Sequence, residues 1–153
     1  MNKVMKIKVK EISDQEQELV AIYCYRVDER VRDIISFVKS RQGQLTGSMN
    51  GSEYEIPVTE IFYIESVDNR VYIYCKNEVY ETRQKLYELE RFLESREFLR
   101  VSKSVVLNLM KVESVKPALN GRFLATLRNG EEVIISRKYV PLLKDKIRGG
   151  KLV

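Results

Sequence analysis

Hydrophobic and polar residues alternate in two short stretches near the start of the chain, residues 5–12 and 19–25. An acidic segment, residues 13–18, separates them, an arrangement typical of a β-hairpin. Apolar side chains then recur at Val31, Ile34, Ile35 and Val38, a spacing that places them on one stripe of an α-helix. Asp28 can cap this helix, which we expect to run from residue 29 to about 42.

Three glycines follow this helix at positions 43, 47 and 51. Glycine weakens regular structure, so residues 42–52 are predicted to form a linker. The chain is thereby divided into a strand-strand-helix element at residues 1–44 and a second domain at residues 45–150.

Beyond the linker, the pattern changes to short strands separated by turn residues, with Asn120-Gly121 and Asn129-Gly130 as hairpin signals. Leu86, Leu89 and Leu93 predict one short amphipathic helix, and residues 138–148 a last one, delayed by Pro141. The strands are expected at residues 54–57, 61–66, 70–75, 78–82, 99–101, 105–107, 111–115, 123–127 and 133–136. The prediction is a mainly β (α+β) fold of small antiparallel sheets with one central short helix.

Composition agrees with an ordinary globular protein, because 44% of the 153 residues are hydrophobic and 32% are charged. No apolar run is long enough to span a membrane, and the amino terminus lacks the apolar block of a signal peptide. We therefore expect the protein to remain in the cytoplasm.

Residues suited to catalysis are scarce. Histidine is absent, which removes the commonest general base, and Cys24 and Cys75 form no CxxC pair. Glu60, Glu65 and Asp68 are the nearest approach to an acidic cluster, but they flank a strand and a turn. We expect no catalytic residue, no metal site and no cofactor, and hence no enzyme.

Charge is distributed unevenly. The net charge is +2 over residues 1–50, −5 over 51–97 and +8 over 98–153, which together give the overall +5. A positive field in the last third is typical of a surface that binds a polyanion, although a solvated basic face without a partner would have the same composition.

Three polar clusters in this basic third follow or precede apolar strands. They are Ser102-Lys103-Ser104 with the adjacent Arg100, Asn120-Gly121-Arg122, and Ser136-Arg137-Lys138-Tyr139. Hydroxyl groups and cations suit phosphate oxygens and base edges, and Arg137 could make a bidentate contact to guanine. One such cluster is more often a solvated strand end, but three of them favour nucleic-acid binding.

Six blocks of the sequence closely resemble the LytTR family of bacterial DNA-binding domains. They occur in family order between about residues 51 and 148, at residues 61–66, 70–74, 81–86, 98–108, 119–122 and 133–139. The resemblance implies an elongated, mostly β fold without a helix-turn-helix, whose strand-end loops enter successive major grooves of double-stranded DNA.

Carried over by position, the base-reading residues correspond to Asn69, Lys103 and Arg137. Further contacts to phosphate, or supporting roles, are implied for Ser102, Ser104, Arg122, Ser136 and Lys138. Some family members carry histidine where Asn69 stands and asparagine where Lys103 stands, so the location of the site transfers better than its base preference.

The resemblance also implies a transcriptional regulator, a homodimer on promoter repeats, and no small-molecule substrate. About 45 residues precede the boundary, fewer than a doubly wound receiver domain needs, so the chain looks like the stand-alone members. Their leading element serves in interaction or dimerisation, and such regulators are often paired with a small inhibitory membrane protein.

Two other interpretations remain open. The helix stripe could dock a protein partner, with the basic surface incidental. Tyr63, Tyr72 and Tyr74 could stack single-stranded RNA bases, but they lie in the acidic middle, which would repel phosphates.

Overall fold

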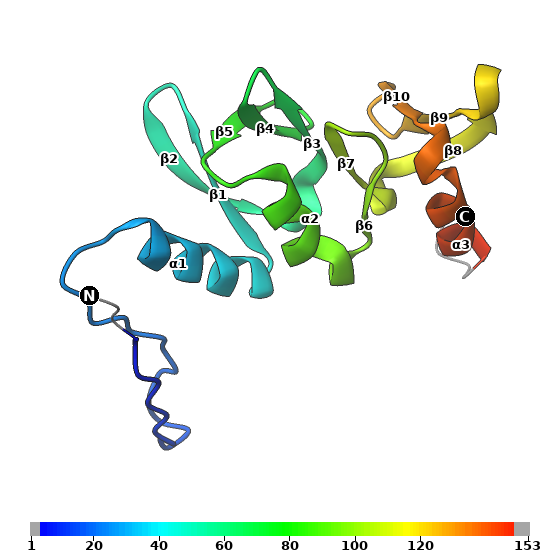
Figure 1. Ribbon diagram of the computed structural model, residues 1–153. Coiled ribbons are helices and arrows are strands. Elements are labelled where there is room, and N and C mark those ends of the chain that lie inside the picture. The colour runs from blue at the N-terminus through cyan, green and yellow to red at the C-terminus, as the bar shows by residue number, and fades with distance from the viewer. Residues whose placement is uncertain (1–3, 149–153) are drawn as a thin grey trace.

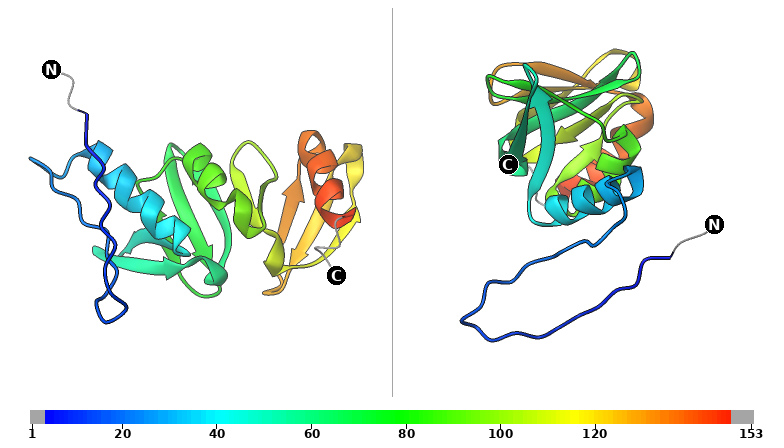
Figure 2. Two further views of the ribbon diagram at one scale, coloured as in Figure 1. Left: turned by 90° about the horizontal axis from the view of Figure 1, so that it is seen from below. Right: turned by 90° about the vertical axis from the view of Figure 1, so that its left-hand side faces the viewer.

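The computed structural model describes residues 4–148. It contains a seven-stranded and a three-stranded antiparallel sheet, which follow one another along an elongated body (Figure 1; Figure 2, left). The helices are α1 (Glu29–Arg41), α2 (Leu86–Leu93) and α3 (Val140–Arg148). The strands are β1 (Gln44–Met49), β2 (Ser52–Pro57), β3 (Ile61–Val67), β4 (Arg70–Cys75), β5 (Val79–Thr82), β6 (Phe98–Arg100), β7 (Val105–Asn108), β8 (Val112–Pro117), β9 (Phe123–Leu127) and β10 (Glu132–Ile135).

The large sheet has the order β2-β1-β5-β4-β3-β7-β6, and the small one the order β10-β9-β8. Strands β3 and β7 lie inside the large sheet and are covered on both faces, since their side chains enter two different hydrophobic cores. Ile64 and Val106 belong to the first core, and Phe62 and Leu107 to the second.

Helix α2 closes the first core with Leu86, Leu89 and Leu93, the three leucines whose spacing predicted it. The second core joins the large sheet to the small one through Ala125, Leu127 and Ile135, and α3 adds Leu143. The two sheets are therefore connected by side chains packed at full burial, as well as by the chain itself.

The predicted mainly β fold is confirmed, and every strand expected after residue 53 is present with small shifts at its ends. The turn residues act as anticipated: Asn120, Gly121 and Gly130 all adopt positive φ angles. The helix from residue 29 is also confirmed, with Asp28 Oδ1 accepting a hydrogen bond from the backbone N–H of Val31 at 3.0 Å.

The hairpin expected at residues 5–12 and 19–25 is wrong. Residues 4–28 contain no strand and run as an extended segment out from the body below α1 (Figure 1; Figure 2, right). An isolated two-stranded hairpin is marginally stable at best, and here the alternating apolar side chains have no core of their own chain to cover.

The linker expected at residues 42–52 is also wrong, because these residues form β1 and the start of β2. The glycines that suggested a linker serve this hairpin. A Cβ at Gly47 would lie 2.7 Å from Cβ of Tyr80 and 2.9 Å from Cδ1 of Ile56, so glycine alone lets β1 lie this close to its neighbours. Asn50 and Gly51 have positive φ and make the turn between β1 and β2.

Helix α1 packs on its own chain. Val31 is buried and Ile34, Ile35 and Val38 are half-buried, while Phe37 makes an edge-on contact with Phe92 of α2 at 5.6 Å between ring centroids. The apolar stripe of α1 therefore packs against other parts of the same chain. Among residues 4–148, no helix has the length and apolar character that crossing a membrane would require.

Candidate nucleic-acid interface

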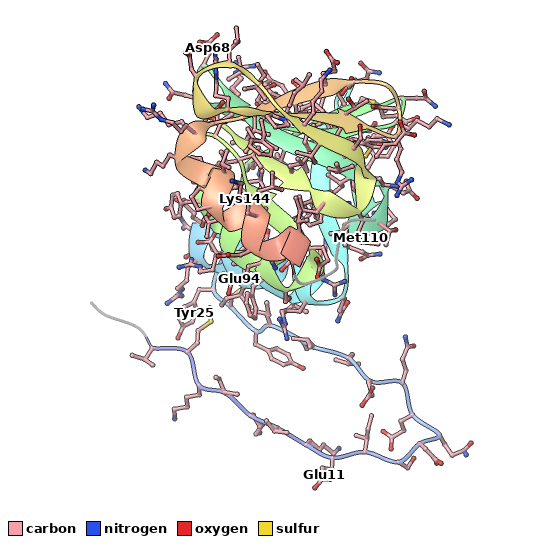
Figure 3. The ribbon with its side chains drawn as sticks, turned by 90° about the vertical axis from the view of Figure 1, so that its right-hand side faces the viewer. Glu11, Tyr25, Asp68, Glu94, Met110 and Lys144 are labelled. Carbon is pink, nitrogen blue, oxygen red and sulfur yellow. The ribbon has the colours of Figure 1, made fainter. Side chains whose placement is uncertain are left out.

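The turn between β3 and β4 consists of Asp68 and Asn69. Val67 pairs with Arg70, so these two residues alone reverse the chain, and both have positive φ angles, 50° and 65°. Asp and Asn tolerate this conformation better than other side-chain-bearing residues, which explains their presence here. Both are exposed, and Asp68 marks the upper rim of the molecule in Figure 3.

The loop between β6 and β7, residues 101–104, lies beside this turn. Strand β7 pairs with β3 in antiparallel register, with Val105 opposite Glu65. Beyond that pair, the backbone N–H of Ser66 donates to the carbonyl of Ser104 at 2.8 Å. The loop that carries Lys103 is therefore fixed to the strand that leads into Asn69.

The end of β10 is joined to the same loop from the other side. The backbone N–H of Ser136 donates to the carbonyl of Val101 at 2.8 Å. A 3-10 turn, Arg137–Tyr139, follows at once and leaves the side chains of Arg137 and Lys138 exposed. Lys103 and Arg137 thus come from two segments that are hydrogen-bonded to each other at their base.

The turn between β8 and β9, Leu119–Gly121, completes the arrangement. A Cβ on Gly121, whose φ is +75°, would lie 2.7 Å from Cδ of Arg137, so the stem of Arg137 passes directly over this glycine. The next residue, Arg122, is half-buried, and its Nε donates to the carbonyl of Leu119 at 3.2 Å.

We call residues 68–69, 102–104, 119–122 and 136–138 the strand-end surface. The structure connects its four segments in one continuous series of contacts, and all eight residues expected to contact DNA lie on it. Four of them are cations, and three of these, Lys103, Arg137 and Lys138, are exposed. Such a surface can attract phosphates and present donors to base edges.

Two of the serines also form hydrogen bonds that hold their own loops in shape. The Ser102 hydroxyl accepts a hydrogen bond from the backbone N–H of Ser104 at 3.2 Å, which tightens the loop. Ser136 starts the 3-10 turn, and its carbonyl accepts from the backbone N–H of Tyr139 at 2.9 Å. Their exposed surface is small, so we expect supporting roles more than base reading.

Arg100 has a structural role in the Lys103 loop that the sequence did not indicate. Its guanidinium donates to the carbonyls of Ser102 and Lys103, at 2.7 and 2.5 Å, and to a carboxylate oxygen of Glu90 on α2 at 2.7 Å. Its side chain is only 18% exposed, so it shapes the loop instead of offering its charge to a ligand. Sequence spacing cannot show this bond, because Glu90 lies ten residues away on another element.

Two of the three tyrosines considered as a platform for RNA bases, Tyr63 and Tyr74, are engaged with each other. The rings of Tyr63 and Tyr74 stack with centroids 4.4 Å apart. Burial, followed by nearby Glu131 for Tyr63 and Glu65 for Tyr74, raises the pKa of both hydroxyls. A stacked, half-buried pair beside carboxylates is a poor site for single-stranded RNA.

The other candidate groups carry no evident chemistry. Burial, together with Glu60 and Glu78, raises the pKa of the Cys75 thiol to about 11, which keeps it protonated and unreactive. Among the residues that the structure describes, no group of three or more histidine, cysteine, aspartate or glutamate side chains could hold a metal ion.

Comparison with known proteins identifies the family. The model of the LytTr DNA-binding domain matches residues 51–148. The chain belongs to the LytTR family. The match covers the same stretch in which the six sequence blocks occur.

Relatives and solved structures agree. An uncharacterized HTH-type transcriptional regulator of Staphylococcus aureus (strain NCTC 8325) is 23% identical over 146 residues, which cover 94% of this chain and 99% of that protein. The sensory transduction protein LytT of Bacillus anthracis is 29% identical over 93 residues, 61% of this chain but only 38% of LytT. The structure of a LytTr DNA-binding domain, from a Bacillus cereus protein described as a methyl-accepting/DNA response regulator, superposes with a TM-score of 0.65. That likeness has 22% identity and covers 69% of this chain and 96% of the other; it supports the LytTR fold.

Proposed function

We propose that this chain is a sequence-specific transcriptional regulator that binds promoter DNA through the strand-end surface. Membership of a family of DNA-binding domains and a relative of nearly equal length named as a transcriptional regulator support the proposal. The observation that carries it is the pair of backbone hydrogen bonds, Ser66 to Ser104 and Ser136 to Val101, which hold three loops at one rim of the molecule.

In this proposal, Asn69, Lys103 and Arg137 reach base edges in successive major grooves. Their side chains are exposed and come from loops that backbone hydrogen bonds join to neighbouring segments, so we expect little conformational freedom to be lost on binding. Lys138 and Arg122 contact phosphates, and Ser102, Ser104 and Ser136 support the loops or bond to the backbone of the DNA. The protein acts as a homodimer on repeated half-sites, whose spacing reflects the two-fold symmetry of the dimer.

Arg137 and Lys138 provide the test, because they are neighbours of like charge with different proposed roles. After a preferred site is selected from a randomised DNA pool, binding of each variant is measured on that site and on random duplex. Arg137→Ala is expected to weaken the selected site about 5- to 150-fold and random DNA far less, since a bidentate base contact contributes about 1–3 kcal/mol of discrimination.

Lys138→Ala serves as the matched control. It is expected to weaken both duplexes to the same degree and to reduce the slope of log affinity against log salt by about one. Equal effects of the two substitutions on selected and random DNA would contradict the division of roles. If no sequence emerges from the pool, the proposal of sequence-specific binding is wrong.

A further inference from the structure

The N-terminal segment, residues 4–27, exposes more apolar side chains than any other part of the described chain. Its large exposed apolar side chains are Tyr25 and eight others: Val4, Ile7, Val9, Ile12, Leu19, Val20, Tyr23 and Val27. Ile7 and Tyr23 are 91% and 94% exposed. Figures 2 and 3 show this segment leaving the body as a long open excursion, with Glu11 near its far end.

The area of this exposed apolar surface is comparable to the area that one chain buries in a dimer interface. A large apolar side chain exposes on the order of 100 Å². Eight of them offer roughly 800 Å², about what one partner contributes to a stable protein–protein interface. Monomeric proteins rarely leave so much apolar surface uncovered.

Strand β2 offers a place for this segment to pair. It is an outer strand of the seven-stranded sheet, and within residues 4–148 its only sheet neighbour is β1. The two-residue turn Asn50-Gly51 and the pair Met49 and Ser52 fix which backbone groups face β1. By the alternation of an antiparallel ladder, the N–H and C=O groups of Glu53 and Glu55 point outward, and Pro57, which has no N–H, ends the open edge.

The side chains of the segment and of the edge are complementary. Lys6 and Lys8 alternate with Ile7 in the segment, and Glu53 and Glu55 alternate with Tyr54 in β2. An antiparallel added strand can place Lys8 opposite Glu53, Ile7 opposite Tyr54 and Lys6 opposite Glu55. Opposite charges directly across a ladder stabilise it, while like charges destabilise it.

Both faces of the edge can accept this strand. On the apolar face, Tyr54 is 40% exposed and its ring already packs against that of Tyr80 at 5.5 Å between centroids, so Ile7 would extend an existing contact. On the charged face, Glu53 is exposed, and the side chain of Glu55 stays 44% exposed although it binds Lys39 of α1 at 2.5 Å.

We propose that residues 5–9 of one chain pair as an added strand with β2 of a second copy of the same chain, and that the reciprocal exchange holds the homodimer together. The second copy is the chosen partner because the segment of the same chain lies on the other side of α1 from β2 (Figure 1; Figure 2, right). This inference specifies the dimer of the proposed function and rests on it for its biological meaning, but its test needs no DNA.

The test is a charge exchange in the full chain. Lys8→Glu, Glu53→Lys and the double variant are compared with the natural chain by sedimentation equilibrium without DNA. The contact occurs twice in a symmetric dimer, so each single substitution is expected to weaken dimerisation by about tenfold or more. The double variant restores the opposite charges and is expected to return to within about threefold of the natural chain.

Lys76→Glu is the matched control, because it makes the same charge change at an exposed turn between β4 and β5 and should leave the dimer intact. The proposal is overturned if the double variant dimerises no better than the single ones, or if the single variants dimerise normally. It is also overturned if the charge exchange changes thermal stability while the chain stays monomeric. That result would show that residues 5–9 pair with β2 of their own chain.

The two proposals can fail separately. A natural chain that is monomeric at all concentrations but still selects a DNA sequence would refute the dimer and leave base reading by the strand-end surface intact. If the dimer responds to the charge exchange as expected but the protein selects no DNA sequence, the dimer proposal stands and the proposal of sequence-specific DNA binding is refuted.

Discussion

Arg100→Ala tests whether the Lys103 loop must be held in advance for the protein to recognise a DNA sequence. The substitution removes the hydrogen bonds to the carbonyls of Ser102 and Lys103 and the ion pair with Glu90. Hydrogen bonds to charged groups contribute about 1.5–3 kcal/mol each, but loop carbonyls at the surface can bond to water instead. We therefore expect the free energy of unfolding to fall by only about 1–2 kcal/mol.

The effect on recognition should be larger than the effect on stability would suggest. A loop released by the substitution must be ordered again when it enters the groove, and fixing the backbone of one residue costs about 1–2 kcal/mol. Affinity for the selected site should fall by about 5- to 30-fold for each residue released. Random DNA should be bound within about threefold as before, because phosphate attraction depends mainly on the exposed cations, which the substitution leaves in place.

The assay is fluorescence anisotropy with selected and random duplexes at one salt concentration, beside thermal unfolding. Arg100→Lys keeps the charge but cannot span two carbonyls and a carboxylate, so it should retain only part of the discrimination. Arg96→Ala is the matched control, since Arg96 also donates to a carbonyl, that of Arg41 at 2.7 Å, at the end of α1. If Arg100→Ala lowers stability but leaves the ratio of the two affinities unchanged, the loop does not need this residue for recognition and the reasoning is refuted.

Three further predictions concern single residues. Gly121→Ala, whose added Cβ would meet the Arg137 stem, should lower discrimination between selected and random DNA, measured by anisotropy; unchanged discrimination would show that this packing does not position Arg137. Gly47→Ala should lower the free energy of unfolding in urea by about 1–3 kcal/mol, because the added Cβ overlaps Tyr80, and a stability equal to that of the natural chain would contradict the close approach. With the other cysteine changed to serine, Cys75 should react with a thiol reagent only on unfolding. Stability should also fall as pH rises from about 9 to about 11, since the unfolded thiol ionises in this range while the folded one stays protonated; Cys75→Ala should remove that part of the slope.

Much of the fold follows from local patterns. Strand β4 has the predicted bounds, and α2 runs from the first to the last of the three leucines that predicted it. Alternating residues over 70–75 and leucines at helical spacing each specify one local structure. Their signals need no information about distant residues. The same is true of the turn residues Asn69 and Gly121, whose positive φ angles match their residue types.

The errors occurred where distant contacts decide. Gly47 looked like part of a linker, but it lies in a strand because Tyr80 and Ile56 approach it closely. Residues 5–12 have a strand pattern, yet a pattern alone gives no partner, and none of the sheets in the described chain includes them. The sequence also could not show that Arg100 forms an ion pair with Glu90. For this reason Arg100 was included in the predicted basic surface, although its charge is paired within the protein.

Selection of DNA sites by three forms of the protein, the natural chain, Lys103→Ala and Arg137→Ala, tests the central claim most directly. If the strand-end surface reads bases, each variant should lose preference at its own position of the selected site and keep the other, since the two side chains come from separate loops held at one rim. If both variants select the same sequence as the natural chain with equal sharpness, these loops do not read the DNA and the account is wrong.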